Sequence, residues 1–308
     1  MKKPIITVIG SLNMDLVTVT KRMPLQGETI TGQSFSTYPG GKGANQAVAA
    51  ARLGAEVHML GKVGKDLFGT KLKDVLQQEG VNEESVEVAT IKETGTASII
   101  ISGQDNRIIV VPGANSEVTP EWVIAHEEKI INSNLLLLQL EIPLDSVIKI
   151  TEIANRYQVP VILNPAPYQK LPKKLIDGVT YLTPNMHEYS QLLDEASPEE
   201  KAQIIAKSIV TKGEDGVEFQ SHNQRITLNG VKVEVVDTTG AGDTFNGALA
   251  VELSKNKNLK DAVLFATMAA TISVTKMGAQ TGMPYVEELE KFYELNASKL
   301  VYKKSKRL

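Results

Sequence analysis

At residues 236–249 the chain reads V-D-T-T-G-A-G-D-T-F-N-G-A-L. The apolar, β-branched run 231–236 leads into this stretch and predicts a strand, and the apolar segment 245–253 predicts a helix. A glycine turn between them leaves the amides of the first helical turn unpaired, and the helix dipole adds partial positive charge. We therefore expect an anion-binding cradle at residues 240–242. Asp243 stands at its edge, either as a general base beside a phosphate or only as a helix cap.

The composition excludes several functional classes. Lysine and arginine number 33 and aspartate and glutamate 36, so the net charge is 33 − 36 = −3, which does not favour nucleic acid. The basic tail 303–307 is too short to change this, and we expect it to be frayed and solvated. The chain has no cysteine, which excludes disulfides and thiolate chemistry and fits a reducing cytoplasm. Polar residues such as Asn132 and Glu141 interrupt the leucine run within 130–142, so we expect no membrane span.

Much of the chain alternates between strand and helix patterns, which predicts an α/β protein with a mostly parallel sheet covered by helices. The expected strands are 5–10, 57–64, 135–140, 159–163, 181–183 and 209–211, and the expected helices are 46–53, 66–80, 144–157, 187–193 and 198–207. The length of 308 residues is compatible with one such domain, 1–308.

Two β-rich insertions, about 16–38 and 94–111, interrupt this alternation and are expected to form one small sheet. In the second insertion, 96–101 and 107–111 flank Gly103-Gln104-Asp105-Asn106, a hairpin signature. Both strands are apolar on each face. They therefore need cover from their own domain or from a partner chain.

A second glycine-rich stretch, P-G-G-K-G-A-N at residues 39–45, opens the expected helix 46–53. Its glycines let the backbone approach a ligand closely. It is not a Walker loop, because no serine or threonine follows Lys42 at the required spacing. The alternative is a tight turn before a helix.

Polar side chains recur at the ends of the expected strands, where open α/β sheets bind ligands. Asp15, Asn45 and Glu141 could bind vicinal hydroxyls of a sugar, or could serve only a turn, a cap and a helix start. Asn185 and Glu188 are spaced i, i+3 and can face one point, which suits hydrated Mg²⁺. A capping asparagine beside a solvated glutamate is the alternative.

Together these motifs resemble the ribokinase-like (pfkB-type) family of carbohydrate kinases, from Ile5 to about Leu289. Residues 40–47, G-G-K-G-A-N-Q-A, resemble the family's first motif, and residues 237–245, D-T-T-G-A-G-D-T-F, its second. Asn13-Met14-Asp15, Glu141, the N-P-A-P run at 164–167 and the spacing of Asn185 and Glu188 resemble members that act on ribose. The resemblance implies a three-layer α/β/α domain with a central, mostly parallel sheet and a small β-sheet lid made by the two insertions.

The resemblance also implies a reaction, the ATP-dependent phosphorylation of D-ribose at its 5-hydroxyl to give ribose 5-phosphate and ADP. Asp243 would take the hydroxyl proton, and the amides of Gly240, Ala241 and Gly242 would stabilise the transferring phosphoryl group. The implied ribose ligands are Asn13, Met14, Asp15, Gly41, Lys42, Gly43, Ala44, Asn45, Glu141 and Asp243. The implied ATP contacts are Asn185, Thr211, Lys212, Gly213, Glu214, Asp215, Gly216, Gly242, Asp243 and Thr267.

Two metal ions and a partner follow from the same resemblance. Mg²⁺ would be held through water by Asn185 and Glu188. K⁺ would activate the enzyme without touching substrate, at a site implied to comprise Asp237, Thr239, Ser273, Lys276, Gly278 and Gly282. The alternative is that Asp237 only caps its turn. The lid of the family often forms a dimer contact, so we expect a homodimer.

One departure and three rival functions remain open from the sequence. The segment between Asn185 and Thr211 is shorter than we expect of the family, so its helix and strand should be abbreviated. Another sugar or a nucleoside could be the acceptor. A sensor without turnover is disfavoured because it needs no base at Asp243. A dinucleotide-binding oxidoreductase is disfavoured because Gly10-Ser11-Leu12-Asn13 follows the first strand in place of G-x-G-x-x-G.

Overall fold

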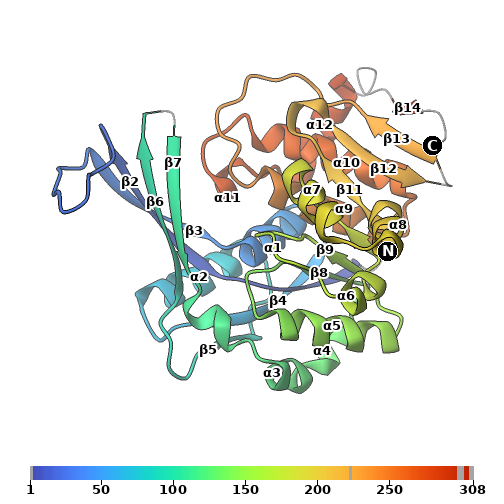
Figure 1. The fold of residues 1–308 in the computed structure, drawn as a ribbon, viewed down its shortest axis with the longest axis horizontal. Coiled ribbons are helices and arrows are strands. Elements are labelled where there is room, and N and C mark those ends of the chain that lie inside the picture. The colour runs from blue at the N-terminus through green and yellow to red at the C-terminus, as the bar shows by residue number, and fades with distance from the viewer. Residues whose placement is uncertain (1–2, 104, 222–223, 297–301, 305–308) are drawn as a thin grey trace.

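The fold was analysed on a computed structural model, which describes residues 3–103, 105–221, 224–296 and 302–304. Six strands in this part of the chain form a parallel sheet in the order β10-β9-β8-β1-β4-β5 (Figure 1). These strands are β1 (Ile5–Ile9), β4 (Glu56–Val63), β5 (Val86–Val88), β8 (Leu135–Leu138), β9 (Val161–Leu163) and β10 (Tyr181–Leu182). The predicted central parallel sheet is confirmed.

The four consecutive leucines of β8 explain how this sheet holds the molecule together. Leu135 and Leu137 join one hydrophobic core, and Leu136 and Leu138 join a second core on the opposite face. Successive side chains of a strand point to opposite faces, so a strand buried on both sides has apolar residues throughout. The run is therefore a central strand between two helical layers.

Helices cover both faces of the sheet, which gives three layers (Figure 1). The first core is built with α1 (Lys42–Arg52), α2 (Leu67–Gln78), α9 (Ala241–Ser254), α10 (Leu259–Ser273) and α12 (Val286–Asn296). The second is built with α3 (Pro120–Ala125), α4 (Glu127–Ile131), α5 (Leu144–Arg156), α6 (Lys173–Gly178), α7 (Met186–Glu195) and α8 (Pro198–Lys207). In the described part of the chain, no helix has the length and apolar character needed to cross a membrane.

The two insertions form the small sheet that the sequence predicted, in the order β3-β2-β6-β7, and it projects from the body of the molecule (Figure 1). Its strands are β2 (Asn13–Thr20), β3 (Ser34–Gly40), β6 (Gly95–Ser102) and β7 (Asp105–Val111). Strands β2 and β6 pair in parallel from Asn13↔Gly95 to Thr20↔Ser102, and both outer pairings are antiparallel. Gln104, in the predicted hairpin turn, lies outside the described residues.

The structure corrects several predicted elements. Residues 231–236 form no strand, because none of the described strands pairs with them and Val235 and Val236 are exposed. Helix α1 begins at Lys42, before the predicted residue 46, so most of the glycine-rich stretch belongs to its first turn.

The region after β10 also differs from the prediction. Strand β11 (Ile209–Thr211) touches the main sheet only through isolated bridges, and it pairs antiparallel with β12 (Val217–Ser221) in a second sheet. That sheet continues through β13 (Gln224–Leu228) to β14 (Tyr302–Lys304), which overturns the prediction of a frayed tail for residues 303 and 304. Residues 305–307 lie outside the described part of the chain.

Helices α1 and α9 approach closely because small residues line their contact. A Cβ added at Gly247 would lie 2.6 Å from Ala49 Cβ and 2.8 Å from the Gln46 carbonyl oxygen. The backbone of α9 therefore lies directly against α1, and this brings the first turns of both helices to one place.

We predict that Gly247→Ala lowers the midpoint of thermal unfolding. Alanine gains about 1 kcal/mol of helix propensity over glycine, but forcing two packed helices apart costs about 1–3 kcal/mol. The backbone oxygen of Gln46 cannot move as a flexible side chain would, so the packing cost should prevail. A thermal melt measures the difference, and a midpoint equal to or above that of the parent protein would contradict this account of the helix contact.

Candidate active site

The first turns of α1 and α9 meet at the carboxyl ends of β1 and β8, and the predicted sugar-binding residues gather there. The hydroxyl of Ser11 donates to Glu141 Oε2 at 2.5 Å, and the backbone amide of Lys42 donates to the same oxygen at 3.2 Å. Glu141, after β8, is thereby fixed to the start of α1. Asp15, on β2, is close enough to both Glu141 and Asp243 for their charges to act on it.

Asp15 carries the clearest electrostatic signature of the site. Burial, and then the negative charges of Glu141 and Asp243, raise the pKa of Asp15 to about 7. A carboxyl group in this environment gains from a ligand that supplies hydrogen-bond donors, as sugar hydroxyls do. A carboxyl group with so strongly raised a pKa is more typical of a binding site than of a structural one.

Lys42 is the cation of the cluster. Burial disfavours its charged form, but the carboxylates of Asp243, Glu141 and Glu188 outweigh this and raise the pKa of Lys42 above its ordinary value. Lys42 also lines a small pocket with Asn185, Glu188 and Asp243. Lys42 therefore lies between the predicted sugar ligands Glu141 and Asp243 and the predicted metal-binding residue Glu188.

Several predicted sugar ligands have their side chains elsewhere. Met14 and Ala44 are buried in the first hydrophobic core, so only their backbones can face the site. Gly41 has φ of 89°, and an added Cβ would lie 2.7 Å from the amide nitrogen of Asn13. An added Cβ at Gly43 would lie 2.6 Å from the amide nitrogen of Ser11. These glycines are needed because α1 lies against the β1–β2 connection.

Asn13 is oriented by Asn115, a residue that the sequence analysis missed. Asn115 Nδ2 donates to Asn13 Oδ1 at 2.7 Å and to the carbonyl of Leu12 at 3.2 Å, and the amide of Leu12 donates to Asn115 Oδ1 at 2.9 Å. Both residues are almost fully buried. Only the position of Gly113-Ala114-Asn115 after the hairpin could have pointed to it.

The proposed base, Asp243, is held by the first turn of α1. Asn45 Nδ2 donates to Asp243 Oδ2 at 2.9 Å, and Gln46 Nε2 donates to Asp243 Oδ1 at 3.0 Å. Asp243 does not cap α9, since Gly240 is the N-cap with φ of 78°. The amide of Ala241 donates to the carbonyl of Thr238 at 3.2 Å, so in this geometry Gly240 and Gly242 are the better candidates for donors to a phosphoryl group.

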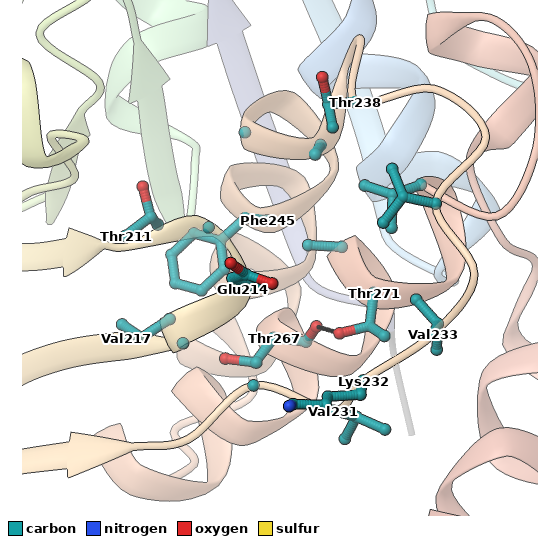
Figure 2. A pocket seen from close by; sticks show the side chains of 18 residues that line it. Thr211, Glu214, Val217, Val231, Lys232, Val233, Thr238, Phe245, Thr267 and Thr271 are labelled. Atoms are coloured by element: carbon teal, nitrogen blue, oxygen red, sulfur yellow. Dashed lines mark hydrogen bonds between the residues drawn. The ribbon is translucent and has the colours of Figure 1, made fainter.

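A cavity of about 360 Å³ lies beside this turn (Figure 2). Of the predicted nucleotide contacts, Thr211, Gly213, Glu214, Gly216, Gly242 and Thr267 line it. Lys212 instead pairs with Glu218 Oε2 at 2.5 Å. Asp215 and Asn185 are not among the residues that line this cavity, and Asn185 lines the small pocket with Lys42.

The 231–236 run finds its role here, because Val231, Lys232, Val233 and Val235 form part of the cavity wall. Phe245, Thr271 and Val274 are further lining residues that the sequence analysis missed. An apolar wall with a few hydroxyl groups suits a flat heterocyclic base, and the turn at Gly242 lies at the end nearest Asp243.

Asn185 and Glu188 form the capping box of α7. Asn185 Oδ1 accepts from the amide of Glu188 at 2.9 Å, and Glu188 Oε2 accepts from the amide of Asn185 at 2.9 Å. Glu188 is buried, not solvated, and burial raises its pKa despite the opposing bond from Asn185 and the charge of Lys42. One carboxylate oxygen remains for a ligand in the pocket, which fits a hydrated cation. Within the described residues, no cluster of three or more acidic or histidine side chains could hold a metal directly.

The predicted K⁺ residues converge around Asp237. Its Oδ1 accepts from the amide and hydroxyl of Thr239 at 2.9 and 2.7 Å, and its Oδ2 accepts from the amide of Gly278 at 2.8 Å. Burial opposes ionisation, but these bonds outweigh it and lower the pKa of Asp237. An added Cβ at Gly282 would lie 2.6 Å from the Ser273 carbonyl oxygen, so this carbonyl lies next to the same loop. The Lys276 side chain pairs with Glu288 at 2.7 Å. Because a lysine side chain has no oxygen, this residue could offer a cation only its backbone carbonyl.

A buried carboxylate between the cluster of predicted sugar ligands and a nucleotide-sized cavity is an arrangement that suits a small-molecule kinase, and the family comparison agrees. The model of the pfkB family of carbohydrate kinases matches residues 3–285, so the chain belongs to that family. Relatives named ribokinase include those of Bacillus subtilis, 46% identical over 92% of this chain and 98% of the relative, and of Lactococcus lactis, 44% identical over 92% and 95%.

Solved structures agree with these relatives. The Thermotoga maritima ribokinase has a TM-score of 0.86 at 34% identity, covering 94% of this chain and 99% of that one. The Arabidopsis thaliana ribokinase, described as complexed with ribose and ATP, has a TM-score of 0.86 at 32% identity, covering 95% and 99%. The predicted family and fold are confirmed.

We predict that Asp15→Asn stabilises the free protein at neutral and alkaline pH. The folded protein binds the Asp15 proton more tightly than the unfolded chain does, since its pKa is about 7 against an ordinary value of 3.8. Asp15 therefore lowers stability progressively as the pH rises through this window. The variant should match the parent near pH 4 and melt higher above pH 7, by about 2–4 °C for each kcal/mol relieved. Melting curves across pH test this, and a difference that does not grow with pH would refute it.

Proposed function

We propose that this chain catalyses the transfer of the ATP γ-phosphoryl group to the 5-hydroxyl of D-ribose. The observation that carries the proposal is the position of Asp243, whose carboxylate is hydrogen-bonded to α1 on the sugar side while its helix turn borders the nucleotide cavity. Membership of the pfkB family and the relatives named ribokinase support the same conclusion.

Different residues of the chain would bind the sugar, accept the proton and stabilise the phosphoryl group. Asp15, Asn45 and Glu141 would bind the sugar hydroxyls and orient the 5-hydroxyl toward Asp243. Asp243 would accept its proton as the oxygen attacks, and the amides at Gly240 and Gly242 would receive the charge of the phosphoryl group. Holding both reactants in line between two helix N-termini supplies most of what phosphoryl transfer needs from a protein.

When Mg²⁺ is bound, it would neutralise part of the negative charge on the ATP phosphates. Asn185 and Glu188 would hold it through water. The capping box keeps their orientation fixed and leaves a carboxylate oxygen of Glu188 in the pocket beside Lys42 and Asp243. The cytoplasm, where ATP and a reducing environment occur together, is the inferred location.

The acceptor could instead be a related sugar, because relatives named deoxyribokinase from Salmonella are 34% identical over 94% of this chain. A coupled assay of ADP release over pentoses, deoxypentoses, hexoses and nucleosides decides between them. D-Ribose should give the highest kcat/KM, and a higher value for another acceptor would replace it.

We predict that Asp243→Asn lowers kcat by about 10²–10⁴-fold while ribose and ATP still bind, because an amide cannot accept the hydroxyl proton. The assay is ADP release with ribose, with binding followed by calorimetry. Activity within a few-fold of the parent would contradict the base assignment.

We also propose that the loop around Asp237 binds an activating K⁺, which would act by fixing the amides at residues 240–242. The carboxylate of Asp237 and the carbonyls near Gly278 and Gly282 supply the oxygen ligands that a hard cation requires. Asp237 accepts hydrogen bonds from both Thr239 and Gly278, so it connects the turn before α9 directly to the segment around Gly278.

K⁺ should raise kcat above its value in Na⁺ or Tris buffers of equal ionic strength, and Asp237→Ala should abolish the difference. Glu234→Ala is the control, because this exposed carboxylate lies on the same loop and bonds neither Thr239 nor Gly278 in the described structure. Equal rates in all buffers for the parent enzyme would remove the cation site.

We propose further that the small sheet closes over the sugar as a lid and forms a homodimer. All residues of β7 are exposed, although Ile108, Ile109, Val110 and Val111 form an apolar run at the edge of the sheet. Ile109 is 62% exposed. Such an edge invites pairing with a second copy unless something covers it.

Ile109→Lys, or Ile99→Lys on the neighbouring strand, should give monomers and raise the KM for ribose. Leu295→Lys is a matched control, because Leu295 is 68% exposed but lies on α12, away from the small sheet. Light scattering at micromolar concentration measures the state, and a monomeric parent protein would disprove the dimer.

A further inference from the structure

The carboxylate of Asp243 accepts from two neutral side-chain amides, those of Asn45 and Gln46. Each of these amides accepts in turn from a glutamine. Gln280 Nε2 donates to Asn45 Oδ1 at 3.0 Å, and Asn45 donates to Asp243 Oδ2. Gln139 Nε2 donates to Gln46 Oε1 at 2.6 Å, and Gln46 donates to Asp243 Oδ1. The first arm passes through a proposed sugar ligand. The second passes through Gln46, which stands in the stretch resembling the family's first motif, and through Gln139, and the proposed mechanism assigns a role to neither.

The orientation of the Gln46 amide is fixed from both of its ends. Asn164 Nδ2 donates to the carbonyl of Thr183 at 3.0 Å, and a carbonyl can only accept. Asn164 Oδ1 therefore faces Gln46, whose Nε2 donates to it at 3.2 Å as well as to Asp243. The Gln46 oxygen must then point the other way, toward the donor that Gln139 supplies. A flipped Gln46 amide would place its oxygen against both Asp243 Oδ1 and Asn164 Oδ1.

A glutamine at position 139 lowers the stability of the core in which it is buried. Gln46 and Gln139 are both fully buried, and within the described structure Gln139 Oε1 accepts no hydrogen bond. A Cβ added at Gly10 would overlap this oxygen at 2.0 Å, so the oxygen lies against the backbone directly after β1. A buried polar atom without a partner lowers stability, and an apolar side chain would avoid the cost. Gln139 thus costs stability and supplies one donor, which goes to Gln46.

We propose that Gln46 is a positioning residue for Asp243 and that Gln139 acts through Gln46. The two glutamines hold one carboxylate oxygen in place, so that the carboxylate plane presents its free lone pairs to the sugar hydroxyl. A neutral donor is suited to this task, because a lysine or arginine in its place would stabilise the ionised carboxylate and weaken it as a base. The inference rests on the proposed role of Asp243 as the base.

The test compares Gln46→Met, Gln139→Met and the double variant, with Gln203→Met as the control. Gln203 is a half-buried glutamine on α8, away from the site. Gln46→Met should lower kcat about 10- to 100-fold, the scale of losing the alignment of a reacting group, with the KM for ribose and for ATP within about 3-fold. Gln139→Met should lower kcat less. It removes the unpaired Gln139 oxygen but leaves the buried Gln46 oxygen without its donor, so its unfolding midpoint should stay close to that of the parent. The double variant should be no slower than Gln46→Met alone, since Gln139 has no separate route to Asp243.

The outcomes distinguish a positioning role of Gln46 and Gln139 from a purely structural role, and both from the role of Asp243 as the base. A Gln46→Met enzyme with unchanged kcat overturns the inference, as does a double variant whose losses multiply. A lower unfolding midpoint in Gln139→Met together with parental kcat would mean that Gln139 only supports the fold. If Asp243→Asn is inactive while Gln46→Met is fully active, the positioning inference alone fails. If Asp243→Asn remains active, the proposed base fails first.

Discussion

The hydrogen bonds that join Asp243 to Asn45 and Gln46 are the constraint on which the rest of the structure depends. They connect residues 198 and 197 positions apart in the chain, and they require the first turns of α1 and α9 to lie side by side. That approach in turn needs the glycine at 247 against Ala49, and the glycines at 41 and 43 against the β1–β2 connection. The parallel sheet supplies the common edge from which these turns extend. The hydrogen bonds of the site can therefore form only if the small residues pack as they do.

The same geometry concentrates negative charge. Asp15 lies within electrostatic reach of Glu141 and of Asp243, and the charges of Asp243, Glu141 and Glu188 favour the ionised form of Lys42. An arrangement chosen only for stability would separate these carboxylates or bury apolar groups instead. A sugar with several hydroxyl groups can donate hydrogen bonds to these carboxylates. The clustered carboxylates thus lower the stability of the free protein, and we expect sugar binding to raise it.

The two glycine motifs allowed the sequence to predict the family, the central sheet, the small sheet and most of the polar cluster. These features depend on local patterns and on the rule that ligands gather at the carboxyl ends of parallel strands. The 231–236 run was mistaken for a strand because β-branched alternation does not reveal whether a neighbouring strand exists to pair with it. Its apolar side chains line a cavity instead. Gln139 and Asn115 were missed for a different reason. A buried amide is recognised by its partners, and those partners lie far away in the sequence.

The order of the chain has a consequence for how the protein is made. Apart from Asp243, the residues that would bind the sugar are synthesised first, from Asn13 to Glu141, and those that line the nucleotide cavity come later, from Thr211 to Val274. The carboxylate of Asp243 emerges from the ribosome well after the amides of Asn45 and Gln46 that receive it. A nascent chain that ends before α9 lacks the carboxylate that accepts from Asn45, although Gln46 can already donate to Asn164. Addition of the glycine turn and the start of α9 then supplies the carboxylate and the anion cradle together, so that a chain ending before residue 240 has neither the proposed base nor the proposed phosphoryl-binding amides.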